Sequence, residues 1–205
     1  MSETLELWDW RRTIADLYAA IRSNPDPQAA WQMWRETRDR LFKTHAQSPL
    51  APKAAADFKG HDLFDYDPSL RVLVTLTPSD GESLRLPAGV DGDVEAVPFG
   101  RTDGLHASLG GELTLYWIAG YGGGVFLPFT DATSGRETYG GGRYLLDTIK
   151  SADLGQSPCG RTVLDFNFAY APSCAYSPHY ICPLAPPANR LPGRVAAGER
   201  NLPIR

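Results

Sequence analysis

The stretch RVLVTLTPSDGESLRL, residues 71–86, decides the fold class of this 205-residue chain. Apolar side chains recur at every second position on both sides of the segment PSDG at 78–81, which is the period of a β-strand. Proline, serine, aspartate and glycine are the residues that form tight turns. The stretch therefore predicts two strands joined by a turn.

The same two-residue period returns along the following 90 or so residues, which is typical of an all-β core. Further strands are expected at 94–99, 112–119, 125–130, 144–149 and 162–170. Glycine-containing turns separate these segments, and no helical pattern lies between them. Roughly seven short strands joined in this way predict an antiparallel β-barrel or β-sandwich.

The N-terminal region has the period of helices instead. Between Thr4 and Ser23, apolar residues recur three and four positions apart, as on one face of an amphipathic helix. Asp26 followed by Pro27 has the residue types of an N-cap and a first helical position, so a second helix should begin there. We therefore expect an α+β fold in which two N-terminal helices pack on the sheet.

We expect one domain over residues 1–205, with a helical hairpin at 1–45, a β core at 69–170 and a C-terminal strap at 171–205. The strap holds 7 of the 17 prolines, so it cannot be a central strand. It also carries enough apolar residues to pack across the sheet as an ordered segment.

Composition excludes several classes of partner. Asp and Glu number 24 against 20 Lys and Arg, for a net charge of −4, and the chain lacks the basic run that nucleic-acid binding requires. No apolar stretch approaches the ~20 residues of a membrane helix. The first residues, MSETLELWDWRR, lack the basic flank and apolar run of a signal peptide. We expect a cytoplasmic protein without a nucleic-acid or membrane partner.

Three strings carry a resemblance to a known family: PFTDATSGRETYGGGRYL at 128–145, LDFNFAYAPSCAYSPHYICPLAPPANRLP at 164–192 and AAGER at 196–200. They resemble the bacterial and archaeal domain-of-unknown-function family 1684, and the resemblance covers most of the chain. It implies a shared fold and a shared site, without an activity, substrate or cofactor. The matching positions are Asp131, Thr133, Gly135, Glu137, Tyr139, Gly142, Arg143, Tyr144, Asp165, Asn167, Tyr170, Cys174, Cys182 and Asn189, whereas Cys159 and His179 depart from the pattern.

The three glycines at 140–142 mark the first candidate site. Glycine allows a close backbone approach, and Glu137, Tyr139, Arg143 and Tyr144 bring an acid, a cation and two phenols to that point. Arginine presents a planar fork for a carboxylate or phosphate, so the group is suited to an anion. Alternatively, the glycines form a bulge, and Arg143 binds backbone carbonyls or pairs with Glu137.

The expected strand at 162–170 supplies the second candidate site. On a strand, Asp165 and Asn167 point to the same face. Burial would raise the pKa of Asp165 and Arg143 nearby would lower it, so Asp165 is either a general base or a member of a buried ion pair. A hydrogen-bond anchor for the C-terminal strap is the structural alternative.

The cysteines form a third group. Cys174, His179 and Cys182 lie within nine residues, and Cys159 would complete a four-ligand zinc site. A disulfide between Cys174 and Cys182, a nucleophilic cysteine, and buried thiols that pack the strap are the alternatives. The other histidines are scattered and form no motif.

Together these residues predict a small-molecule-binding protein, with an enzyme slightly favoured, that performs acid/base chemistry on an anionic metabolite. The expected acid/base groups are Glu137 and Asp165, and the expected binding groups are Arg143, Tyr139, Tyr144 and Asn167. No cofactor is expected. One alternative is a non-enzymatic ligand-binding or interaction module, in which the helices or the strap form a homodimer or partner surface. Another is a metal-binding protein.

Overall fold

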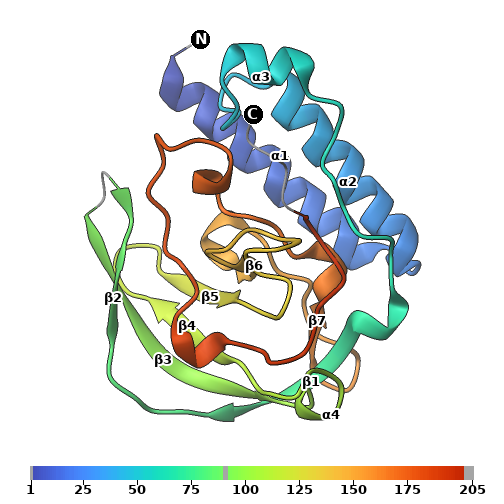
Figure 1. Ribbon diagram of the computed structural model, residues 1–205, viewed down its shortest axis with the longest axis vertical. Helices are drawn as coiled ribbons and strands as arrows, with labels where there is room; N and C mark the ends of the chain where they lie inside the picture. Colours follow the sequence, from blue (N-terminus) through green and yellow to red (C-terminus); the bar gives the residue numbers. More distant parts are fainter. Residues whose placement is uncertain (1, 90–91, 201–205) are drawn as a thin grey trace.

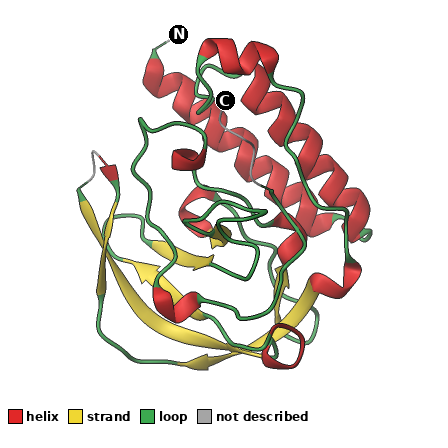
Figure 2. Ribbon diagram, in the orientation of Figure 1, coloured by secondary structure: helices red, strands yellow, loops and turns green. Residues whose placement is uncertain are grey.

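The chain forms an α+β structure in which the two long N-terminal helices lie on one side of a curved sheet (Figures 1 and 2). The computed structural model describes residues 2–89 and 92–200. The helices in these ranges are α1 (Glu3–Ser23), α2 (Pro27–Thr44), α3 (Pro52–Asp57) and α4 (His106–Leu109). The strands there are β1 (Arg71–Pro78), β2 (Leu84–Pro87), β3 (Asp93–Asp103), β4 (Thr114–Ile118), β5 (Gly124–Phe129), β6 (Arg143–Asp147) and β7 (Thr162–Asp165).

The sheet is antiparallel and nearly closes into a barrel, which confirms the predicted fold class. Its strand order is β6-β5-β4-β3-β1-β7, and β2 pairs with β3 outside this path. The two ends of the path approach each other at Tyr144 of β6 and Tyr170, which follows β7. Their backbones exchange two hydrogen bonds, at 2.8 and 3.1 Å.

β3 is longer than the segment 94–99 that the sequence predicts. Residues near its start pair with β2, residues near its end pair with β1, and its middle pairs with β4. A register shift between Pro98 and Gly100 marks a bulge in the pairing with β4. Proline and glycine disturb the two-residue pattern at this bulge, so the second half of the strand carries a weak sequence signal.

The helical hairpin begins and ends as its sequence predicts. The Asp26 carboxylate accepts hydrogen bonds from the backbone amides of Gln28 and Ala29, and Pro27 occupies the first helical position. Figure 1 shows α1 and α2 side by side against the barrel. Trp31 of α2 fastens this contact, because its indole nitrogen donates a 3.0 Å hydrogen bond to the Asn167 carbonyl.

The predicted strand at 162–170 is wrong beyond Asp165. The chain enters the 3₁₀ turn η4 (Phe166–Phe168) there, and the Asp165 carboxylate accepts a 3.0 Å hydrogen bond from the backbone amide of Asn167. An aspartate side chain that binds the backbone two residues on competes with strand pairing. Asp165 and Asn167 therefore do not share a strand face; they contact each other directly.

The proline-rich strap crosses the barrel as an ordered segment (Figure 1, orange to red). The buried Asn189 side chain holds it to the sheet: its amide nitrogen donates to the carbonyls of Thr114 and Pro128, and its oxygen accepts from the Thr114 amide, all at 2.8 Å. Residues 201–205 of the expected strap lie outside the described residues. None of the described helices combines the length and apolarity needed to cross a bilayer.

Candidate functional site

Arg143, the expected anion-binding residue, is buried and binds the protein's own backbone. Its side chain is 1% exposed and lies 3.3 Å from the Asp131 carboxylate. It donates hydrogen bonds to the carbonyls of Val195, Ala197 and Glu199. The structure thus places Arg143 in the carbonyl-binding arrangement that the sequence left as an alternative, with Asp131 as its ion-pair partner in place of Glu137.

The other residues around the three glycines point to different partners. Glu137 forms a two-point ion pair with Arg194, at 2.9 and 2.6 Å, and this hydrogen bonding lowers the pKa of its carboxyl. The buried Tyr144 hydroxyl donates to the Pro183 carbonyl. Tyr139 faces a cysteine in the strap. The structure does not bring these side chains together with Arg143 around a common space.

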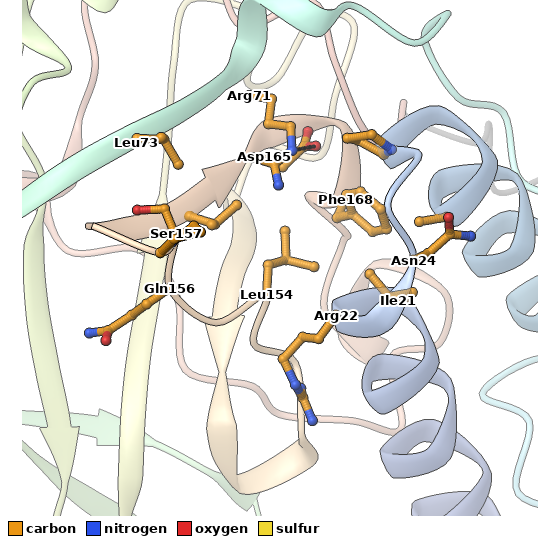
Figure 3. Close-up of a pocket in the computed structure, with 14 residues that line it drawn as sticks. Ile21, Arg22, Asn24, Arg71, Leu73, Leu154, Gln156, Ser157, Asp165 and Phe168 are labelled. Carbon is orange, nitrogen blue, oxygen red and sulfur yellow. Dashed lines mark ion pairs between the residues drawn. The ribbon is translucent and has the colours of Figure 1, made fainter. Parts of the chain in front are cut away.

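A cavity lies instead beside Asp165, between the helical hairpin and strands β1 and β7 (Figure 3). Its volume is about 330 Å³, at the lower end of the range for small-molecule sites. Its apolar lining includes Ile21, Leu73, Leu154 and Phe168. Its polar lining includes Arg22, Asn24, Arg71, Gln156, Ser157 and Asp165.

Asp165 is the buried carboxylate of this cavity, with a side chain that is 1% exposed. Its Oδ1 accepts hydrogen bonds from the backbone amide and the side-chain amide of Asn167, at 3.0 and 2.7 Å. Its Oδ2 makes longer contacts, 3.4 Å from the Tyr66 hydroxyl and 3.7 Å from Nε of Arg71. Burial raises the pKa of Asp165 above its usual value, although Asn167 and Arg71 oppose that effect.

The local fold explains why these groups meet. Arg71 and Asp165 are directly opposed on the antiparallel pair β1 and β7, so their side chains extend to the same side of the sheet. Asn167 follows in the turn η4 and is fully engaged: its oxygen accepts from the Asp67 amide, and its amide nitrogen donates to the Asp67 carbonyl and to Asp165. Asn167 therefore positions Asp165.

A second charged cluster, which the sequence did not reveal, joins α2 to the strap. Glu199 is 1% exposed and binds the Arg38 guanidinium, the Tyr176 hydroxyl and the backbone amide of Ala171. His61 lies 3.5 Å from the same carboxylate. Burial alone would raise the pKa of Glu199, but the positive charge of Arg38, with His61 and the hydrogen bonds, lowers it below its usual value.

One sequence signal points to this second cluster. Arg38 follows Trp31 and Trp34 on the apolar face of α2, where a charged residue needs a buried partner. The partner, Glu199, is 161 residues away. Because the cluster is enclosed and its carboxylate is well supplied with donors, its arrangement is that of a structural ion pair.

The cysteines do not assemble into a metal centre within the described residues. No group of three or more His, Cys, Asp or Glu side chains is arranged there to hold an ion. Cys159 is exposed, and the ring of His179 packs against Tyr180. Cys174 and Cys182 lie close together as free thiols, with the Cys174 amide 3.4 Å from the Cys182 sulfur.

Comparisons with known proteins place the chain in a family. The protein is similar to the solution NMR structure of the uncharacterized protein from gene locus rrnAC0354 of Haloarcula marismortui, with 37% identity and a TM-score of 0.58. The match covers 84% of this chain and 92% of the other. No curated protein matches. The model of the family described as a protein of unknown function, DUF1684, matches residues 56–200. The chain therefore belongs to the DUF1684 family, as the strings in its sequence indicated.

Proposed function

We propose that the protein binds a small anionic molecule in the cavity beside Asp165 and performs acid/base chemistry on it. The observation that carries this proposal is a buried carboxyl group with a raised pKa that lines a cavity next to a partly exposed arginine. A titratable group shifted by burial and a specific charge partner is a candidate for proton transfer.

Arg71 is suited to hold the anionic group. Its side chain is 31% exposed, and its 3.7 Å contact with Asp165 is longer than a close ion pair. A guanidinium binds carboxylates and phosphates at two points. A bound anion that pairs with Arg71 would weaken the positive field on Asp165, and the pKa of Asp165 would rise further. Substrate binding would thus favour the protonated acid.

Asp165 would exchange the proton through Oδ2. Oδ1 already accepts two hydrogen bonds from Asn167, which fix the carboxyl group in place, whereas the contacts of Oδ2 are longer. The Tyr66 hydroxyl keeps its proton, because burial and the negative charge of Asp165 raise its pKa to about 12. It can therefore donate a hydrogen bond to the nearby Oδ2. Leu154 and Phe168 on the cavity wall would contact the carbon part of the ligand.

A second cavity of about 340 Å³ lies between the turn at 79–82 and strap residues 186–188. It also contains an arginine, Arg101, but its two acidic residues, Asp80 and Glu82, are exposed to solvent. A solvated carboxylate lacks the environment that tunes an acid or base. The cavity beside Asp165 therefore supports the function better.

The test is an NMR titration of the isotope-labelled full chain with two probes, a small dicarboxylate and a phosphate monoester. We expect at least one probe to shift amide signals of β1 and β7 in the wild type and in the control Arg101→Ala, and neither to do so in Arg71→Ala. If Arg71→Ala binds as well as the wild type, or no probe shifts these signals, the proposal is wrong.

Native mass spectrometry of the purified protein then separates an enzyme from a binding module. An enzyme should carry an unreacted substrate in Asp165→Asn and a different molecule, or none, in the wild type. The same molecule in both proteins would favour a non-enzymatic ligand-binding module.

A further inference from the structure

Cys174, Cys182 and Tyr139 lie together in a separate group, and the proposed function does not use it. None of the three lines the cavity beside Asp165. Cys174 belongs to the 3₁₀ turn η5 (Ser173–Ala175), and Cys182 follows eight residues later in the strap. Tyr139 reaches them from the loop before β6.

The backbone holds the two thiols close together without a disulfide. The amide of Cys174 donates to the sulfur of Cys182 at 3.4 Å, and the Tyr139 hydroxyl lies 3.6 Å from the sulfur of Cys174. Backbone hydrogen bonds from Ser177 to Ser173 and from Tyr180 to Ser177 fold the intervening segment into turns. Both cysteines are half-buried, so the pair is not sealed from solvent.

The two thiols are electrostatically unequal. Hydrogen bonding from Cys182, followed by the Tyr139 hydroxyl and backbone amides, outweighs burial and lowers the pKa of Cys174 to about 6. The same hydrogen bond, together with burial, raises the pKa of Cys182, an effect that the backbone amide of Cys174 and the Lys150 ammonium only partly offset. Tyr139 stays a protonated donor, since the contact with Cys174 raises its pKa to about 12. Tyr144, whose hydroxyl donates to the Pro183 carbonyl, is a further titratable group near the pair: burial, and then the charges of Cys182 and Cys174, raise its pKa.

We propose that Cys174 and Cys182 form a dithiol site that undergoes thiol–disulfide exchange with small disulfides, with Cys174 as the attacking thiolate and Cys182 as the resolving thiol. A thiolate beside a second thiol of high proton affinity is the arrangement that this chemistry needs, because the thiolate is the nucleophile and the second thiol must wait until the first has reacted.

The exchange proceeds in two steps. The Cys174 sulfur forms a bond to one sulfur of the small disulfide, the original sulfur–sulfur bond breaks, and one thiolate leaves and takes a proton from water. The negative charge on Cys174 is then gone, and with it the hydrogen bond that held the proton on Cys182. Cys182 gives that proton to water and attacks the Cys174 sulfur, which releases the second thiolate. Two cysteine thiols are oxidised by two electrons, and one disulfide is reduced to two thiols.

Cys159 is a third, exposed cysteine, and hydrogen bonding, first from Ser157, lowers its pKa to about 7. Its own reaction must therefore be removed from the assay. Cys159→Ser serves as the background for Cys174→Ser and Cys182→Ser. Trypsin leaves Cys174 and Cys182 in one peptide, residues 162–190, and Cys159 in another, residues 151–161. Mass spectrometry can therefore assign each product.

The probe is oxidised glutathione, added to the reduced full-length protein at neutral pH. In the Cys159→Ser background we expect a disulfide inside peptide 162–190. With Cys182→Ser added we expect a stable glutathione adduct on Cys174, and with Cys174→Ser added, little reaction. A stable adduct that persists while Cys182 is present, or equal adduct formation on either cysteine alone, would refute the proposed roles.

A pH profile of iodoacetamide alkylation in the same background distinguishes a reactive pair from two packed thiols. Cys174 should react at least about tenfold faster than Cys182 at neutral pH, with a midpoint near 6. Tyr139→Phe and Cys182→Ala should each move that midpoint upward, because each removes a hydrogen-bond donor to the Cys174 sulfur. Equal rates for the two cysteines, or a midpoint that neither substitution moves, would overturn the proposal.

Discussion

Replacing Arg143 with methionine should weaken the attachment of the strap to the barrel and lower the free energy of unfolding. Methionine keeps much of the side-chain volume but removes the charge and every donor. The change leaves the buried Asp131 carboxylate without its cation, and it leaves the carbonyls of Val195, Ala197 and Glu199 without the guanidinium that binds them.

The magnitude follows from these lost partners. Removing one member of a buried ion pair costs about 3–5 kcal/mol, because the other charge stays buried. Asp131 keeps hydrogen bonds from the amides of Thr133 and Val195, so we expect the total to stay within that range. For a chain of this length, such a loss lowers the melting temperature by roughly 6–20 °C.

Urea unfolding followed by circular dichroism measures the change. The matched control is Arg136→Met in the preceding loop, where the arginine is exposed and the expected change is below about 0.5 kcal/mol. If Arg143→Met loses less than about 1 kcal/mol, the structural role is refuted. An intact fold that had lost the ability to bind an anion would restore Arg143 to the binding role that its sequence suggests.

Three further substitutions test the electrostatics and the helix start. Burial raises the pKa of Asp165 in the folded state, so its carboxyl favours folding at low pH, and this contribution is lost as the pH rises through the folded-state pKa. The wild type should therefore lose stability relative to Asp165→Asn as the pH rises above the ordinary aspartate pKa of ~4 in urea titrations, whereas a constant difference would contradict the raised pKa. The opposite sign applies to Glu199, whose pKa is lowered in the folded state. Its carboxylate stabilises the fold at pH values above the ordinary glutamate pKa, and this contribution is lost as the pH falls. Glu199→Gln should cost about 3–5 kcal/mol at neutral pH and less in acid, by thermal unfolding; a difference that does not shrink in acid counts against the buried pair. Asp26→Ala removes the N-cap of α2 and should cost about 0.5–2 kcal/mol by urea unfolding, and a neutral effect would show that the cap is dispensable.

The sequence predicts the fold well where the determinants are local. Burial alternates along β2 and the start of β3, so their two-residue period appears in the residues themselves, and the cap formed by Asp26 depends only on its immediate neighbours. The error after Asp165 has a local cause too. Phe166 and Phe168 alternate as a strand would, but the Asp165 side chain binds the backbone of Asn167 and ends the strand.

The candidate site is less accessible to sequence reasoning because its contacts are distant along the chain. Asp165 appears as a candidate from its residue type and position, whereas its partner Arg71 lies on another strand. Arg143 looks like a binding residue because spacing cannot show that the strap would return to cover it. Many arginines and glutamates are present, and nothing in their types says that Arg38 pairs with Glu199.

Residues 195–199 accept hydrogen bonds from Arg143 and form an ion pair with Arg38, and these contacts bear on how the chain folds during its synthesis. The ribosome delivers the helices and the barrel strands first. Glu199, which neutralises the buried Arg38, and the backbone carbonyls that bind Arg143 follow near the end of the described residues. Until then, the Arg38 guanidinium must remain in water or be buried without its carboxylate, and Arg143 has Asp131 but lacks the carbonyls of the strap, so final packing must wait. The nascent protein therefore completes its native structure only after this segment has emerged.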